Sequence, residues 1–132
     1  MKKTVLASAL LLALLSSPVR GEGAIAVAVG EGGPKNGYAY TMNVRNSSAE
    51  SAEKEALNGC REQAKVYGVQ PERCRLVASF RNQCVAVAFD QQERAAGWDL
   101  GSSRDDAIAN AVKKCAAGGA RNCKPHNVEC DQ

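Results

Sequence analysis

Apolar residues alternate with alanines along two segments of the chain that lie sixty positions apart. The pattern occupies residues 24–29 and recurs at residues 85–89. A period of two is typical of a β-strand, here with one bulky face and one small face. Because both faces are apolar, we expect both segments to be central strands of a sheet, and the alanine face allows a helix to pack closely.

Helical periodicity follows each of these segments at some distance. Alanines and other apolar residues recur every three or four positions over 49–64 and 107–115, and each stripe includes a cysteine on its buried face. A serine with an acidic residue three positions later precedes each stretch, at Ser47 and at Ser102. This spacing is a helix-capping pattern, so the sequence predicts two amphipathic helices.

The correspondence between the two halves of the chain indicates an internal duplication. Gly37-Tyr38 matches Gly97-Trp98 sixty positions later, and the helical stripe recurs at an offset of fifty-five. We infer two repeats, about 24–84 and 85–130, each reading as strand, strand, helix, strand. The final strand, over 124–130, contains a proline and is best placed at a sheet edge.

The sequence therefore predicts an α+β fold. We expect two tandem β-β-α-β repeats that form one antiparallel or mixed sheet, packed by two helices and held by three disulfides.

The N-terminus has the features of a secretory signal. A basic start precedes an apolar run over 5–15, too short to span a bilayer of about 30 Å, and small residues stand at positions −3 and −1 before Glu22. We expect residues 1–21 to be a cleaved signal peptide and 22–132 to be one domain without a membrane span; an uncleaved anchor is the alternative. The protein would then be periplasmic or extracellular.

Removal of the signal changes the interpretation of the charge. The chain has 17 basic and 14 acidic residues, but Lys2, Lys3 and Arg20 belong to the signal, which leaves the mature chain neutral. The basic balance is therefore no evidence for nucleic-acid binding. The small size and the single histidine exclude a multidomain enzyme and a histidine-rich metal site.

Six cysteines in a short exported chain indicate a disulfide framework. Their spacings contain no C-x-x-C, which disfavours the alternative of a zinc site. Equivalent cysteines of the two repeats should have equivalent roles, so each helix would be tied to the entrance of the following strand. The pairs expected on this basis are Cys60–Cys74, Cys115–Cys123 and Cys84–Cys130, the last joining the ends of the two repeats.

Several of these motifs resemble a family of exported bacterial domains, domain-of-unknown-function family 4189. The resemblance covers about residues 24–130 and rests mainly on A-I-A-V at 24–27, on Gly37-Tyr38, and on the segments 48–60 and 74–78. It implies export, a duplicated fold and disulfides, and it supplies no catalytic residues.

The chain carries few candidates for chemistry. It contains no P-loop, G-x-S-x-G or H-E-x-x-H motif, and we expect neither a cofactor nor a metal. His126 could act as a general base with Glu129 or Asp131, although a structural surface histidine is the simpler interpretation. Tyr38, Tyr40 and Trp98 could form a contact surface, or could instead fill the core.

Two hypotheses about function follow from these observations. The first is an exported, non-catalytic interaction module of the bacterial envelope or extracellular space. It would bind a protein or a surface polymer, for example as a hydrolase inhibitor, an adhesion component or an envelope-assembly factor. The alternative is a small secreted enzyme that uses His126.

Overall fold

The computed structural model describes residues 21–132, so the predicted signal peptide lies outside it except for Gly21. The elements follow the predicted order of strand, strand, helix, strand in each repeat. They are β1 (Glu22–Val29), β2 (Tyr38–Asn46), α1 (Ala49–Val66), β3 (Arg75–Arg81), β4 (Cys84–Asp90), β5 (Ala95–Gly101), α2 (Arg104–Ala116) and β6 (Lys124–Cys130), with 3-10 turns η1 (Pro34–Asn36) and η2 (Pro71–Arg73).

The strands form two sheets, which corrects the expectation of a single one. Each sheet is antiparallel and has three strands, in the orders β2-β1-β3 and β5-β4-β6. The physical reason is that each central strand already has both edges paired by strands of its own repeat. The α+β class, the two β-β-α-β repeats and the two helices are confirmed, and β6 lies at an edge as predicted.

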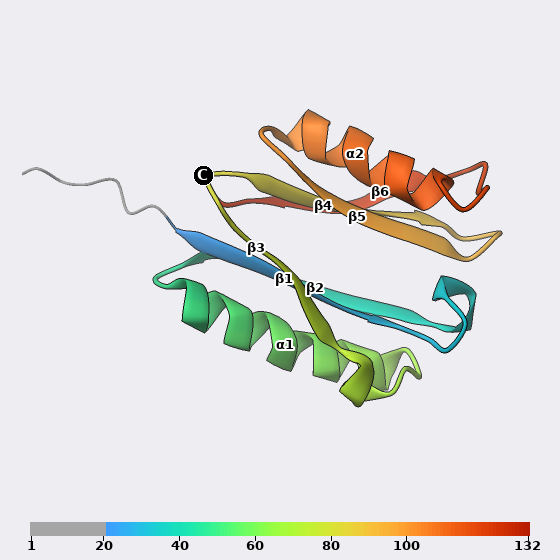
Figure 1. Ribbon diagram of the computed structural model, residues 1–132, viewed down its shortest axis with the longest axis horizontal. Coiled ribbons are helices and arrows are strands. Elements are labelled where there is room, and N and C mark those ends of the chain that lie inside the picture. The colour runs from blue at the N-terminus through green and yellow to red at the C-terminus, as the bar shows by residue number, and fades with distance from the viewer. Residues whose placement is uncertain (1–20) are drawn as a thin grey trace, which may run out of the picture.

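The two sheets lie face to face with one helix on each outer side (Figure 1). The alanine face of each central strand packs against the helix of its own repeat, and the cysteine of each helix is buried there. Small residues let strand and helix approach closely. A side-chain carbon added at Gly97 of β5 would lie 2.2 Å from the Cys115 nitrogen of α2, so only glycine fits at this contact.

The bulky faces of β1 and β4 meet between the sheets. They bring together a second, shared core around Ile25, Val27, Phe80, Val85 and Val87, with the aromatic rings of both repeats packed at its margins. Neither repeat can cover its bulky face alone. The pair of sheets is therefore held together by the same alternation that defines the strands.

The helix starts differ by one residue from the predicted caps. Ser48 and Ser103 are the N-caps, and the hydroxyl of Ser48 accepts the Ser51 N–H at 3.1 Å. Two serines stand side by side before each helix, and the spacing to the acidic residue selected the first of them, whereas the second is the N-cap. In the described part of the chain, no helix is long and apolar enough to cross a membrane.

The three disulfides join Cys60 to Cys74, Cys115 to Cys123 and Cys84 to Cys130, the pairs expected from the repeat, and leave none of the six cysteines free. One detail differs from the expectation. Cys84 opens β4 and faces Cys130 across to β6, so this bridge lies within the second sheet and does not join the two repeats. The equivalent cross-strand pair of the first sheet is Ala24 with Ser79.

Candidate functional site

The layer between the two sheets is open along two edges, and each edge carries a groove. At one edge β3 lies across from β5, and at the other β2 lies across from β6. We call these the β3–β5 groove and the β2–β6 groove. Their volumes are about 720 Å³ and 620 Å³ respectively.

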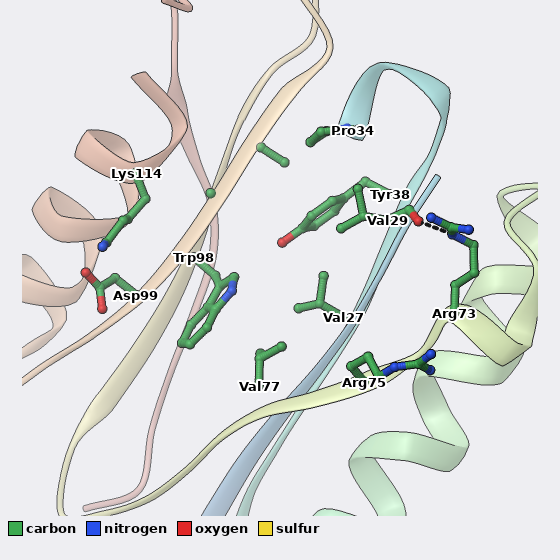
Figure 2. Close-up of a pocket in the computed structure, with 12 residues that line it drawn as sticks. Val27, Val29, Pro34, Tyr38, Arg73, Arg75, Val77, Trp98, Asp99 and Lys114 are labelled. Carbon is green, nitrogen blue, oxygen red and sulfur yellow. Dashed lines mark hydrogen bonds between the residues drawn. The ribbon is translucent and has the colours of Figure 1, made fainter. Parts of the chain in front are cut away.

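The floor of the β3–β5 groove is apolar. It is formed by the outer end of the β1 bulky face and by aromatic and aliphatic residues from the flanking strands: Val27, Val29, Tyr38, Val77, Ala96 and Trp98. In Figure 2 the Trp98 ring faces the two valines Val27 and Val77, and the Tyr38 hydroxyl points into the space between the sheets. The strand alternation predicted from sequence therefore also builds the groove.

The hydroxyl of Tyr38 is the unusual polar group of this groove. It is buried and has no hydrogen-bond partner among the described residues. Burial, and to a lesser extent the neighbouring Tyr40, raises the pKa of Tyr38 well above its ordinary value. The group therefore stays protonated and can donate a hydrogen bond to a bound molecule. An unpaired buried polar group costs about 1–3 kcal/mol, so an acceptor from a ligand would be favoured here.

Charged side chains surround the mouth of the groove. Arg73, Arg75 and Lys114 outnumber the single carboxylate of Asp99. Backbone carbonyls position the two arginines: Arg73 Nε donates to Val29 O at 2.5 Å, and Arg75 Nη1 donates to the carbonyl of Glu72 at 2.6 Å. No carboxylate of the residues described lies within salt-bridge distance of either arginine. In Figure 2 the two guanidinium groups lie on the η2 side of β1, and Lys114 lies with Asp99 on the α2 side of β5, so the positive charge stands at the rim, apart from the apolar floor.

The β2–β6 groove has a different interior because aromatic rings occupy it. The rings of Phe89 and His126 lie 4.8 Å apart, and Tyr40 lies 5.9 Å from His126, both edge to face. The His126 ring makes these contacts and no side-chain hydrogen bond to any described residue. Glu129 lines the same groove, whereas Asp131 lies beyond the end of β6.

The strand register shows which residues of the two grooves are equivalent. Val27 pairs with Tyr40, and its repeat partner Val87 pairs with Trp98. Trp98 is therefore the counterpart of Tyr40 and not of Tyr38, which corrects the match made from the two glycines. The connection between β1 and β2 is longer than the turn between β4 and β5, and this difference shifts the second strand by two positions.

By the same comparison, Val29 of β1 is the counterpart of Phe89 of β4, so the β3–β5 groove has a valine where the β2–β6 groove has a phenylalanine. The structure brings no ring from β3 to the position that His126 occupies in the other groove. The two grooves therefore differ in lining more than in size: the β2–β6 groove has a ring on β6 that packs against its aromatic wall, and the β3–β5 groove has no such ring on β3.

The three residues predicted as a contact surface lie around this intersheet layer. Trp98 lines the β3–β5 groove, Tyr40 lines the β2–β6 groove, and Tyr38 lines both. All three are partly buried and also pack on the shared core, which agrees with the alternative expectation that they fill the core. The six cysteines line neither groove.

Sequence reasoning missed the contribution of β3 to the site. Arg75 and Val77 stand on alternate positions of that strand, and this alternation could have indicated that both residues face the same side. It could not show which sheet would lie opposite. Within residues 21–132, no group of three or more His, Cys, Asp or Glu is placed to hold a metal ion.

Comparison with known proteins identifies a family. The model of the family described as a domain of unknown function, DUF4189, matches residues 23–130, and the chain belongs to this family. No curated protein and no solved structure matches the chain.

Proposed function

We propose that this DUF4189 protein is an exported, non-catalytic interaction module that binds an aromatic side chain of a partner protein in its β3–β5 groove. The observation that carries the proposal is the difference between the two equivalent grooves. In the β2–β6 groove the His126 ring packs edge to face on Phe89 and Tyr40. The β3–β5 groove retains the aromatic wall, Trp98, and lacks the ring that would cover it.

The ring contacts of the β2–β6 groove give a template for the ligand. Aromatic rings with centroids about 4.5–7 Å apart gain about 0.5–1.5 kcal/mol beyond the burial of their area. A partner ring that entered between Trp98 and Val77 would make the contact that His126 makes with Tyr40. A phenol would in addition bring an oxygen that can accept the hydrogen bond of the unpaired Tyr38 hydroxyl.

The charges at the mouth favour an acidic segment around that ring. Lys114 and Asp99 lie together on the α2 side of β5 (Figure 2), so the excess positive charge at the rim is that of Arg73 and Arg75, which would attract acidic residues beside the aromatic one and repel basic residues. Complementary charge acts mainly on the association rate and on partner choice. The ligand class is therefore an acidic peptide segment that presents an aromatic side chain.

Two features support an exported binding protein. Three disulfides are typical of proteins that work in an oxidising compartment, which agrees with the predicted signal peptide.

The alternative function is a secreted enzyme based on His126, in which the histidine would be paired with Glu129 or Asp131. The first of these shares the groove of His126, but Asp131 is buried beside Arg45 at another site.

The chain provides its own probe for binding because its single tryptophan, Trp98, lines the groove. We would titrate the exported protein with a short acidic peptide containing one phenylalanine, and with the same peptide carrying leucine instead, and follow tryptophan fluorescence. We expect the phenylalanine peptide to bind about threefold to tenfold more tightly, as the energy of one aromatic pair implies. Equal affinities would contradict the aromatic selectivity.

Two adjacent residues of β3 give a matched pair of variants. Leu76 and Val77 are each 36% exposed, but only Val77 lines the groove. Val77→Asp should abolish the fluorescence response, since it places a carboxylate on the apolar floor. Leu76→Asp should leave the response unchanged. If the two variants behave alike, the binding site is not this groove.

A further inference from the structure

Asp131, the penultimate residue, is a buried carboxylate whose charge is incompletely satisfied. In the chain that still carries Gly21 the residue is 2% exposed, and Oδ1 accepts the backbone N–H of Arg45 at 3.1 Å. The other oxygen, Oδ2, is buried and has no hydrogen-bond partner among the described residues. The nearby cation, Arg81, pairs with Glu22 and gives Asp131 no hydrogen bond, so a positively charged donor would be favoured at the free oxygen of Asp131.

The site is built from backbone as well as from the carboxylate. The Asp131 N–H donates to the carbonyl of Gln83 at 2.8 Å, which fixes the end of β6 against the β3–β4 connection. Arg45 adopts a left-handed conformation with φ of 59°, uncommon for a residue other than glycine. Two chain segments therefore hold the carboxylate in place.

The start of β1 lies directly against this carboxylate. A side-chain carbon added at Gly21 would lie 2.5 Å from Oδ1 of Asp131 and 2.6 Å from the Arg45 Cα. The Gly21 Cα itself is therefore within about 4 Å of the carboxylate, given a C–C bond of about 1.5 Å. The next atoms along the chain are the Gly21 carbonyl and the nitrogen of Glu22, which opens β1.

We propose that Asp131 is the binding site for the α-ammonium group created at Glu22 when the signal peptide is removed. The inference rests on the predicted cleavage between Gly21 and Glu22. Hydrolysis of that peptide bond by one water leaves a carboxylate on Gly21, which departs, and an amine on Glu22. The amine takes up a proton at neutral pH, because an α-amino group has a pKa near 7.7–8.0.

The resulting ion pair connects the two ends of the mature domain. β1 belongs to the first sheet and Asp131 follows β6 of the second, so the contact would join the repeats at a point that no disulfide crosses. Before cleavage the same nitrogen is a neutral amide with a single hydrogen. Processing therefore supplies the charge that the buried carboxylate lacks.

Arg81 is the other cation in this region. Its guanidinium pairs with the side-chain carboxylate of Glu22. That contact raises the pKa of Arg81, with a smaller contribution from Asp131. Arg81 is therefore engaged by Glu22, and Asp131 is left for the α-ammonium. Arg81→Gln is the variant that separates the two cations.

The experiment uses the full precursor, exported from a bacterial host. Intact mass first establishes whether the mature chain begins at Glu22. A second precursor carries Ser-Gln inserted between Gly21 and Glu22, so that cleavage after Gly21 leaves the ammonium group two residues away from its site and the inserted pair does not place a small residue directly before Glu22. We expect the insertion to lower Tm by about 4 °C or more. In an Asp131→Asn background, the insertion should change Tm by about 1 °C or less.

The reactivity of the α-amine provides an independent measurement. In the unextended protein it should be acylated about tenfold more slowly at neutral pH than in Asp131→Asn, because ion pairing keeps it protonated. Arg81→Gln should preserve both the Tm difference and the slow acylation. A mature chain that begins elsewhere, an equal effect of the insertion with Asp131 and with Asn, or equal acylation rates would each overturn the proposal.

Discussion

At the residue scale, Asp90 shows how one carboxylate can organise several segments of backbone. Its side chain at the end of β4 accepts the N–H groups of Gln92 and Glu93 in the following turn and that of Asn122 before β6, all at about 3 Å. Hydrogen bonds from Asn122 and Glu93 to the charged form hold the pKa of Asp90 below its ordinary value. The ionised carboxylate is thus part of the fold.

This pKa shift predicts acid sensitivity at one position. Because the folded-state pKa of Asp90 lies below that of the unfolded chain, near 3.9, its contribution is fully present above that pH and is lost as the pH falls toward the folded value. We expect Asp90→Asn to be less stable than the parent at pH 7 and to lose less stability between pH 5 and pH 2. Thermal melts across this range would measure both effects.

Asp105→Asn, at an exposed position in the first turn of α2, is the control for this experiment. It should change the pH profile little. A parent and an Asp90→Asn variant with parallel profiles would show that the carboxylate does not provide this stability.

His126 is the second residue for which a direct test is available. Its ring packs on Phe89 and Tyr40, and a structural role agrees with these contacts. We expect any catalytic activity detected in the exported protein to survive His126→Ala to within about an order of magnitude, whereas loss of a general acid or base costs about 10²–10⁴. A larger drop in a variant with an unchanged circular dichroism spectrum would support the enzyme hypothesis.

At the scale of elements, the spacing between each helix and its sheet depends on very small side chains. Gly97 of β5 lies so close to α2 that an added carbon would meet the Cys115 nitrogen at 2.2 Å and the Lys114 carbonyl carbon at 2.7 Å. Both are backbone atoms and cannot move aside as a flexible side chain could. The contact therefore fixes the distance between strand and helix.

We expect Gly97→Ala to destabilise the protein by about 1–3 kcal/mol, the usual cost of overpacking a close contact. Gly118, just after α2, is the matched control, since a carbon added there meets nothing within 4 Å. Gly118→Ala should be neutral. Chemical denaturation of the two variants measures the difference, and equal midpoints would contradict this account of the strand–helix spacing.

The sequence predicts the individual elements well and their assembly less well. Alternation of large residues with alanine identifies β1 and β4, because the two faces of each strand meet different partners, a helix and another sheet. The same alternation cannot tell whether the bulky face meets a helix or a second sheet, and so the single predicted sheet was wrong. The register of β5 was also misassigned, since the glycine before Trp98 serves helix packing and the one before Tyr38 ends a loop.

The candidate site was only partly visible in the sequence for a related reason. Tyr38 and Trp98 could be named as aromatic residues beside glycines, but Val77 gains its role only when β3 lies across from β5. Asp131 has no neighbours in sequence that mark it as buried. Its partners, Arg45 and Gly21, lie 86 or more positions earlier, in and just before the first repeat.

At the scale of the whole molecule, the two repeats differ in how their sheets are stapled. Each has a bridge from its helix to the entrance of its third strand, with sequence separations of 14 and 8. Only the second sheet has a further bridge between its strands, Cys84 to Cys130, with a separation of 46. The small core, rich in alanine, gives these bridges a large share of the stability.

The two bridges of the second repeat allow loop length to be tested at matched burial. Cys84 and Cys115 are both fully buried, and their partners Cys130 and Cys123 are both partly buried, so replacing either pair by alanine should remove a similar amount of packing. The chain-entropy account assigns about 4 kcal/mol to the longer loop and about 2.6 kcal/mol to the shorter one. We therefore expect loss of Cys84–Cys130 to lower the free energy of unfolding by about 1.4 kcal/mol more than loss of Cys115–Cys123.

Non-reducing peptide mapping of the parent would first verify all three pairs, and denaturant unfolding of the two double variants would then give the difference. A reversed order would mean that native-state geometry at these bridges outweighs the entropy of the unfolded chain.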